Sequence, residues 1–161
     1  MPKIVSIQDA IQKGKGTVSV HGWCYRERGS NELRFLVVRD SSNIIQCVIE
    51  KAKVPPKLWA DADKIRIETS LEITGAIKKD ARAPTGYEIR VKDLRIVSLC
   101  DTYPIQKDLS VEFLADNRHL WLRSRRMTAI LKIRSTVFGA IHSYFRDNGF
   151  YEFQSPIFQP T

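Results

Sequence analysis

The first hundred residues alternate between apolar and polar positions in short runs that have the two-residue period of β-strands. In the first run, 17–26, one face carries small or apolar side chains and the other carries bulkier ones; the two sets are Val18, Val20, Gly22 and Cys24, and His21, Trp23 and Tyr25. Further runs cover 33–39, 44–50, 71–77 and 87–97. Turn-forming residues occupy 28–32 and 40–43, and a basic loop with Pro and Gly occupies 78–86.

Two local signals predict short helices beside these strands. Ser6 and Asp9 have the spacing of a capping box, which predicts a helix over 7–13 that ends at Gly14. After a Pro-Pro pair, a second short helix is expected near 57–63.

The order of these elements indicates the fold. Five short strands, with a helix between the third and the fourth, are typical of a five-stranded OB-fold barrel. We therefore predict a mainly β fold with some α-helix, an OB-fold domain over 1–100. Another small antiparallel barrel, such as an SH3-like one, is the alternative.

The pattern changes after a linker predicted at 101–110. From Ser124 onward, apolar residues recur close to helical spacing, and the Asn-Gly pair at 148–149 predicts the end of that helix. An apolar strand is then expected over 150–158. These apolar surfaces need to be covered by another subunit or by residues outside this sequence. Residues 111–161 are therefore interpreted as the first piece of a second, incomplete domain.

Composition and charge narrow the classes of partner. The chain has 161 residues, of which 43% are hydrophobic, so it can bury a core. Lys and Arg number 26 against 18 Asp and Glu, and the net charge of +8 favours a polyanion, either nucleic acid or an acidic membrane surface. No apolar run is long enough to span a membrane, and the first ten residues have no targeting pattern. We therefore expect a cytoplasmic protein.

Motifs for metal or nucleotide chemistry do not occur in the sequence. The three cysteines and three histidines are scattered without ligand spacing, so neither a disulfide framework nor a zinc site is expected. No glycine-rich phosphate-binding motif and no metalloprotease motif occurs. We expect no catalytic residue and no metal site in this chain.

The second and third predicted strands supply a candidate pair of base-reading residues. Alternation allows an inward-facing set made of Leu36, Val38, Ile45, Cys47 and Ile49. In that case Phe35 and Gln46 share the exposed face. The ring would stack on an unstacked base, worth about 1–3 kcal/mol, and the amide would hydrogen-bond the edge of that base. The alternative is that Phe35 is a core residue, because its strand is apolar on both faces.

Basic residues are expected around this pair. Arg26 and Arg28, at the end of the first strand, would hold phosphates or base edges, and Lys78, Lys79 and Arg82 would add positive charge from the loop before the fifth strand.

Linked motifs along the chain resemble those of class II aminoacyl-tRNA synthetases of the aspartyl, asparaginyl and lysyl subgroup. The resemblance to their anticodon-binding barrel is carried by Gly22-Trp23, Arg26, Arg28, Arg34-Phe35, Arg39-Asp40 and Ile45-Gln46. Residues 103–105, 113–114 and 117–124 look like the hinge and the following segment of the asparaginyl enzymes. Residues 149–156 are similar to class II motif 1, which forms the dimer interface in the family and ends at a signature proline.

The resemblance implies roles for several of these residues. Phe35 would stack on the central uridine of the anticodon, and Gln46 would bind the edge of that base. Glu88 and the loop at 78–86 would inspect the neighbouring bases. The implied dimer interface includes Phe150, Phe153 and Pro156. The implied partners are tRNA(Asn) and a second copy of the chain, with no DNA and no membrane.

The parent enzyme implied by the resemblance charges tRNA(Asn) with asparagine, using ATP and Mg2+. The family's motifs 2 and 3, which hold ATP, do not occur in these 161 residues, so we expect this chain alone to bind no cofactor and to be inactive. An aspartyl enzyme is one alternative, although Trp121 stands where aspartyl enzymes usually have an acid. A stand-alone tRNA-binding or assembly module is another. Such a module should be monodisperse, whereas a truncated enzyme should dimerise or aggregate through 127–158.

Overall fold

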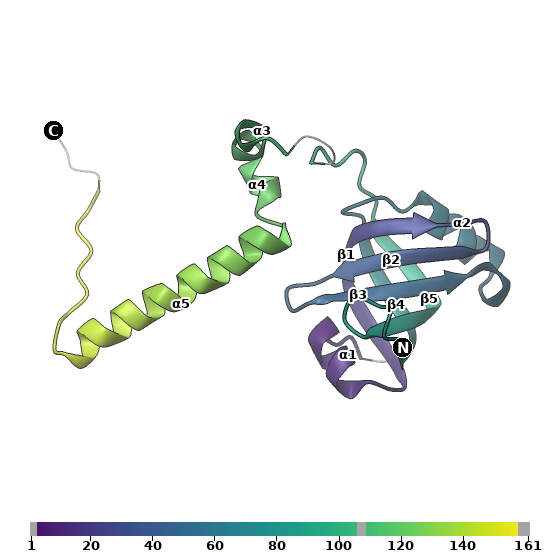
Figure 1. Cartoon of the computed structure of the whole chain (residues 1–161), viewed down its shortest axis with the longest axis horizontal. Coiled ribbons are helices and arrows are strands. Elements are labelled where there is room, and N and C mark those ends of the chain that lie inside the picture. Colours follow the sequence, from purple (N-terminus) through teal and green to yellow (C-terminus); the bar gives the residue numbers. More distant parts are fainter. Residues whose placement is uncertain (1–2, 106–108, 158–161) are drawn as a thin grey trace. The chain divides into compact units, whose positions relative to one another are not determined.

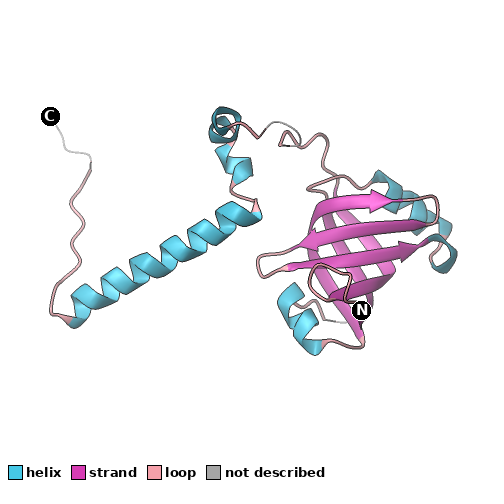
Figure 2. Cartoon of the chain, in the orientation of Figure 1, coloured by secondary structure: helices cyan, strands magenta, loops and turns pink. Residues whose placement is uncertain are grey.

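The computed structural model describes residues 3–105 and 109–157, and the chain divides into two compact units, 1–104 and 105–161. Figure 1 labels the elements of each unit, and Figure 2 colours them by type. The first unit is a β-barrel with short helices, and the described part of the second contains helices and no strand.

The first unit is a closed barrel of five strands. The strands are β1 Thr17–Gly29, β2 Leu33–Arg39, β3 Ile44–Glu50, β4 Ser70–Lys79 and β5 Tyr87–Ser98. They pair in the order β1-β2-β3-β5-β4, and β4 closes the barrel by pairing with β1. Neighbours are antiparallel except β3 and β5, which run parallel. This is the predicted OB-fold, and the SH3-like alternative is wrong.

Three strands are longer than the sequence prediction. β2 and β3 have the predicted bounds, but β1 continues to Gly29, β4 runs from Ser70 to Lys79, and β5 ends one residue later than expected, at Ser98. Arg28, expected in a turn, and Lys78, expected in a loop, therefore lie in strands. Each extension finds a pairing partner, because Arg28 lies opposite Phe35 on β2 and Lys78 lies opposite Glu88 on β5.

Short helices lie on opposite sides of the barrel (Figure 1). α1 (Ile7–Lys13) has the predicted bounds, with the Ser6 side chain accepting from the Asp9 N–H and Gly14 in the left-handed conformation at its end. After a 3-10 turn, η1 (Lys51–Lys53), α2 (Pro56–Lys64) is one residue longer at each end than expected, and it packs against β5.

The turn between β2 and β3 anchors α1 to the barrel, chiefly through the Asp40 carboxylate, with Ser42 and Asn43 bonding to Gln8 as well. Asp40, in the turn between β2 and β3, accepts the Ile7 N–H through Oδ2 at 2.7 Å. Its Oδ1 accepts from the Ser42 N–H at 2.7 Å, the Ser42 hydroxyl at 2.6 Å and the Asn43 N–H at 2.9 Å. Partial burial alone would raise the pKa of Asp40, but these hydrogen bonds outweigh it and lower the pKa below its ordinary value.

The face that alternation predicted fills the interior of the barrel. The whole inward-facing set is buried: Leu36, Val38, Ile45, Cys47 and Ile49. The alternation expected in β1 also holds, since Val18, Val20, Gly22 and Cys24 are buried while His21 and Trp23 are exposed. At Gly22 a β-carbon would lie 2.3 Å from the Arg39 carbonyl oxygen, so only glycine lets β1 and β2 approach this closely. Burial raises the pKa of the Cys24 thiol to about 12, so this cysteine is a neutral core residue.

The second unit contains three helices within its described residues. α5 (Arg125–Asp147) follows the prediction: the Ser124 hydroxyl accepts the Met127 N–H at its start, and Gly149 has φ 82 just beyond its end. The shorter α3 (Val111–Asp116) and α4 (Arg118–Trp121) were not expected.

The strand expected over 150–158 is wrong for its described part, because residues 150–157 form no strand. Position 158 lies outside the described residues. A strand needs a neighbouring strand to pair its backbone groups, and the described residues of this unit contain none.

Candidate nucleic-acid interface

A β-bulge in β1 decides which side chains reach the outer face of the barrel. Cys24 lies opposite Val38 and Arg26 lies opposite Val37, so Tyr25 is an extra residue without a partner on β2. Residues directly opposite each other on antiparallel strands share a face of the sheet. Arg26 therefore points outward with Val37, although before the bulge the even-numbered residues of β1 point inward.

Contacts on both sides fix the bulge. The guanidinium groups of Arg26 and Arg39 each lie 5.5 Å from the centre of the Tyr25 ring. Arg39 also donates to both carboxylate oxygens of Glu68 at 3.0 Å. Glu68 has a left-handed backbone with φ 68, and its N–H donates to the Cys24 carbonyl at 2.6 Å.

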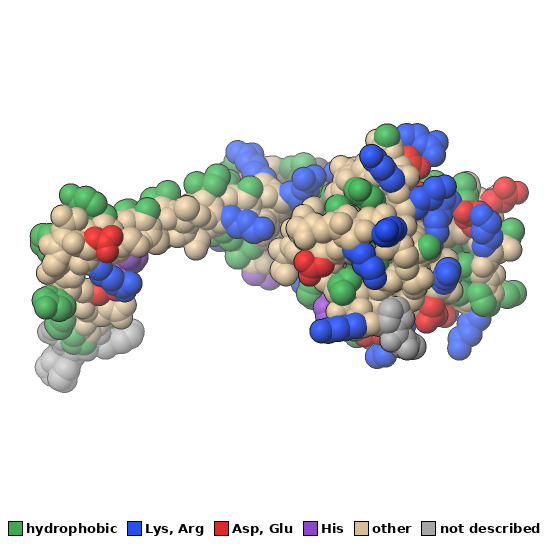
Figure 3. Space-filling view, turned by 90° about the horizontal axis from the view of Figure 1, so that it is seen from below, with side chains coloured by type: hydrophobic (Ala, Val, Ile, Leu, Met, Phe, Trp, Pro, Cys, Tyr) green, Lys and Arg blue, Asp and Glu red, His purple; other side chains and the backbone are tan. Residues whose placement is uncertain are grey.

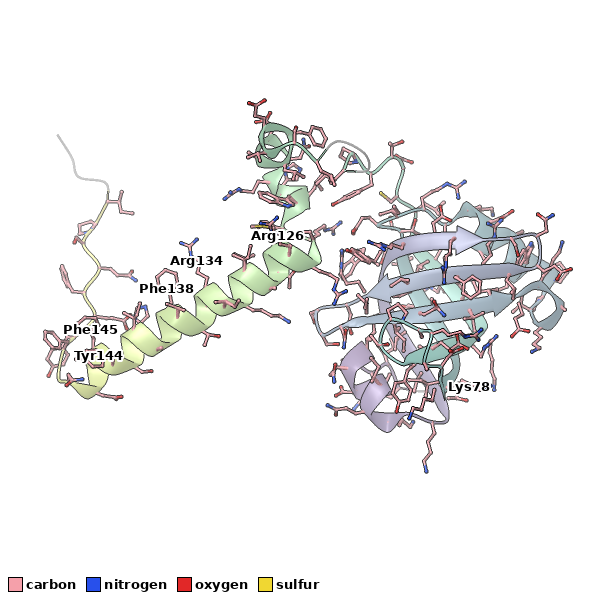
Figure 4. The ribbon with its side chains drawn as sticks, viewed as in Figure 1. Lys78, Arg126, Arg134, Phe138, Tyr144 and Phe145 are labelled. Carbon is pink, nitrogen blue, oxygen red and sulfur yellow. The ribbon has the colours of Figure 1, made fainter. Side chains whose placement is uncertain are left out.

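Two rows of side chains cross the outer face as a result. The first, which we call the Gln46 row, runs through Arg26, Val37, Gln46, Glu88 and Lys78. The second, the Phe35 row, runs through Arg28, Phe35, Val48 and Arg90. All the predicted tRNA-binding residues lie in these rows except Lys79 and Arg82. Lys78 lies at the β4 end of the Gln46 row and is labelled in Figure 4.

Phe35 lies outside the core. Its side chain is half-buried on the outer face, and the Arg28 guanidinium lies over the ring, 5.0 Å from its centre. Unstacked bases pack on aromatic rings and on guanidinium planes. Phe35 and Arg28 together therefore form a surface on which a base can stack.

The expectation that Gln46 is exposed is wrong. Gln46 is only 6% exposed, and its neighbour Glu88 is 2% exposed. Because β5 pairs with β3, Glu88 lies beside Gln46, and Gln46 Nε2 donates to Glu88 Oε2 at 3.2 Å. Alternation within β3 cannot reveal a neighbour that comes from a strand some forty residues later.

The other Glu88 carboxylate oxygen, Oε1, can still accept a hydrogen bond. Glu88 Oε1 lies 2.7 Å from Arg90 Nη2, but without hydrogen-bond geometry, and this buried atom has no hydrogen-bond partner. The short distance alone does not satisfy this oxygen, because a hydrogen bond also requires the N–H to be aligned with it. The N–H of a base edge is a suitable donor for it.

Arg90 and Glu50 complete the polar cluster, and the sequence analysis missed both. Arg90 Nη1 lies 2.5 Å from Glu50 Oε1, and Lys53 Nζ lies 2.7 Å from Glu50 Oε2. Lys53 and, secondarily, Arg90 hold the pKa of Glu50 below its ordinary value. The only signal for Arg90 was its position two residues after Glu88, which places both on one face of a strand.

A pocket of about 260 Å³ opens beside these groups. It is lined by Val48, Glu50, Lys53, Lys78, Arg90 and Val91. Its rim combines cationic donors with carboxylate acceptors, the mixture that recognises polar base edges by hydrogen bonding.

Arg82 lies outside the rows, in the loop after β4. Its guanidinium donates to the two Asp80 carboxylate oxygens at 3.2 and 3.0 Å. These bonds, together with the Arg82 backbone N–H, lower the pKa of Asp80 to about 2. Arg82 is therefore paired within its own loop, whereas Lys78 has no ion-pair partner among the described residues.

The residues expected at a dimer interface belong to the second unit and are exposed: Phe150, Phe153 and Pro156. The Phe150 and Phe145 ring centres are 5.4 Å apart, and the backbone N–H of Phe150 donates to the Phe145 carbonyl. Figure 4 shows Arg134, Phe138, Tyr144 and Phe145 along α5. The helix exposes a larger apolar set: Ile130, Leu131, Ile133, Val137, Phe138, Ile141, Tyr144 and Phe145.

Across residues 3–105 and 109–157, no group of His, Cys, Asp and Glu side chains is arranged to hold a metal ion. Within the same residues no helix has the length and apolar character needed to cross a membrane.

Comparison with known proteins gives two family matches. An OB-fold nucleic-acid-binding domain of the tRNA anticodon type matches residues 18–97, and the class II tRNA synthetases (D, K and N) match residues 110–161. An asparagine–tRNA ligase of Thermoplasma acidophilum is 48% identical over 144 residues, which are 89% of this chain and 34% of that protein. One from Symbiobacterium thermophilum is 41% identical over 160 residues, or 99% of this chain and 37% of that protein.

A solved structure agrees with these matches. Asparaginyl-tRNA synthetase from Pyrococcus horikoshii, complexed with asparaginyl-adenylate, superposes with a TM-score of 0.87 at 31% identity, covering 98% of this chain and 37% of that one. The barrel is thus an OB-fold of the nucleic-acid-binding class, followed by a class II synthetase segment. The chain belongs to the asparaginyl-tRNA synthetase family. It spans about a third of the length of the curated relatives it matches.

Proposed function

We propose that the barrel reads the anticodon of tRNA(Asn) for an asparagine–tRNA ligase, with Phe35 stacking on the central uridine. The observation that carries this proposal is the pair of rows on the outer face. They bring a half-exposed ring next to a buried amide and carboxylate, and they end in cations on both sides.

The chemistry of uridine fits these groups. Its Watson–Crick edge offers one N–H donor between two carbonyl acceptors. The spare capacity of Glu88 Oε1 suits the donor, and the Gln46 amide can donate to a carbonyl once its bond to Glu88 is exchanged. Because both groups are already buried, a base that cannot satisfy them leaves a desolvated polar group unpaired, which makes discrimination strong.

Two further roles belong to the same proposal. Arg26, Arg28 and Lys78 neutralise the phosphates around the stacked base, with Arg82 a weaker contributor because Asp80 already pairs with it. The apolar face of α5, with Phe150, Phe153 and Pro156, associates with a second copy of the chain. ATP and Mg2+ belong to the reaction of the whole ligase, and we assign neither to a residue of this chain.

The test is a double-mutant cycle between protein and RNA. Affinity is measured at one fixed salt concentration for an asparagine tRNA transcript and for the same transcript with its central anticodon uridine replaced by cytidine. The wild-type chain is compared with Phe35→Leu, which keeps an apolar side chain but removes the ring. Val97→Ala, which truncates an exposed apolar side chain of β5 outside both rows, is the control.

Each single change is expected to weaken binding by about 1–3 kcal/mol, or roughly 5- to 150-fold, and the two together by little more. Val97→Ala should bind like the wild type. If wild type and Phe35→Leu bind both transcripts equally, the chain holds RNA through its net charge alone and the base-reading assignment is wrong.

A further inference from the structure

The loop between α1 and β1 is built against the strand ends beside the Gln46 row. Its sequence is Lys-Gly-Lys-Gly over 13–16, and Gly14 and Gly16 have φ 64 and 86, so the chain turns tightly. The Gly16 carbonyl accepts the Ile77 N–H of β4 at 3.0 Å. A β-carbon at Gly14 would lie 3.4 Å from the ring of Tyr87, the first residue of β5.

These contacts place four lysines on neighbouring segments of the chain, and we call them the four-lysine patch: Lys13, Lys15, Lys78 and Lys79. Lys13 ends α1 and Lys15 lies in the loop that follows it, and Lys78 and Lys79 directly follow Ile77, the residue that the loop binds on β4. All four are exposed, and among the described residues none has an ion-pair partner. Segments 13–16 and 76–79 contain no acid, and the carboxylate that follows, Asp80, is occupied by Arg82.

Position links the patch to the base-reading surface. Lys78 is itself a member of the Gln46 row, opposite Glu88, so the patch begins where that row ends. Figure 3, which views the barrel from the side of α1, shows many Lys and Arg side chains across this face, with Asp and Glu side chains among them. A nucleic-acid strand whose base lies on the rows would meet these ammonium groups next.

We propose that the four-lysine patch binds backbone phosphates of the RNA strand that leaves the base-reading rows, a contact that contributes affinity and register but no base selectivity. This inference rests on the proposed function. Lysine ammonium groups are compact point charges without the planar fork that reads a base edge, so they recognise phosphate rather than sequence. Continuity with the rows favours RNA over an anionic lipid surface as the polyanion.

The test compares two double variants of the whole chain that remove the same charge. K13Q/K15Q removes the loop half of the patch. K57Q/K64Q removes two exposed lysines from α2, on the opposite side of the barrel, where Lys64 makes only a surface pair with Asp61. Affinity for the asparagine tRNA transcript is measured between about 50 and 200 mM salt, with the central-cytidine transcript alongside.

K13Q/K15Q is expected to lower the slope of log affinity against log salt by about 0.7 for each phosphate that the variant no longer neutralises, equally for both transcripts. K57Q/K64Q should keep the wild-type slope. If the two variants have equal salt slopes, the proposed phosphate contact is wrong. It is also wrong if K13Q/K15Q binds anionic vesicles more weakly than the wild type while its RNA binding is unchanged. Loss of discrimination between transcripts by the wild type would instead refute the proposed base reading, so the two failures can be told apart.

Discussion

Replacing Asp40 by Asn is the sharpest test of how the barrel holds α1. The substitution keeps the size of the side chain and can keep Oδ1, which accepts three hydrogen bonds from Ser42 and Asn43. At the other position it replaces an acceptor by an NH2 donor that faces the Ile7 N–H, 2.7 Å from the native oxygen. Flipping the amide would restore that bond but forfeit the other three.

The cost follows from the charged bond at Ile7. A hydrogen bond to a charged group is worth about 1.5–3 kcal/mol, so D40N should lower the free energy of unfolding by about that amount at pH 7. The pKa of Asp40 is depressed in the folded protein. Its contribution is therefore fully present above the unfolded pKa of about 3.9, and it is lost as the pH falls through the lower folded pKa.

The assay is urea unfolding of the whole chain, followed by far-UV circular dichroism at pH 7 and again near pH 2.5. Wild type and D40N should differ by about 1.5–3 kcal/mol at pH 7, and the difference should narrow in acid. Glu27→Gln, which removes an exposed carboxylate at the end of β1, is the control and should stay within about 0.5 kcal/mol of wild type. A gap that is absent at pH 7, or equally wide in acid, would refute the reasoning.

Two further predictions concern packing. Gly22→Ala places a β-carbon 2.3 Å from the Arg39 carbonyl oxygen and should destabilise the barrel by about 1–3 kcal/mol in urea unfolding. Gly139→Ala, in α5 with nothing within 4 Å of the new atom, should cause no loss and add about 0.5–1 kcal/mol of helix stability; a loss like that of Gly22→Ala would contradict the steric explanation. Phe145→Asp on the apolar face of α5 should weaken self-association about tenfold or more in light scattering, whereas Ser143→Asp should leave it unchanged. Equal self-association of these two variants would remove α5 from the interface.

Most of the barrel was readable from the sequence because each strand carries its own two-residue alternation and is bounded by turn residues. The bounds of β2 and β3 and the buried set on them follow from local pattern alone. α1 was readable for the same reason, since Ser6 and Gly14 mark its two ends. The extra residues of β1 and β4 were not, because Arg28 and Lys78 are held in strands by partners distant in the chain.

The candidate site was harder to predict from the sequence than the fold. Phe35 and Gln46 share the outer face, as alternation requires, but the burial of Gln46 depends on a parallel pairing with β5 that no local pattern encodes. Arg90 was not predicted as a site residue for the same reason, because its contact with Glu50 joins two different strands. The strand expected after α5 shows the reverse error: apolar residues at 150–157 suit a strand, but propensity cannot supply the neighbour that a strand requires.

The bulge at Tyr25 decides which face of the barrel each later residue of β1 occupies. One additional residue reverses the phase of everything that follows it on β1, so that Arg26 and Arg28 face solvent while Cys24, two positions earlier, faces the core. If β1 kept Tyr25 but paired without the bulge, Arg26 would lie opposite Leu36 and Arg28 opposite Arg34, and both guanidinium groups would turn toward the hydrophobic interior. The proposed RNA-binding surface therefore depends on the backbone irregularity at Tyr25 as well as on the identity of its side chains.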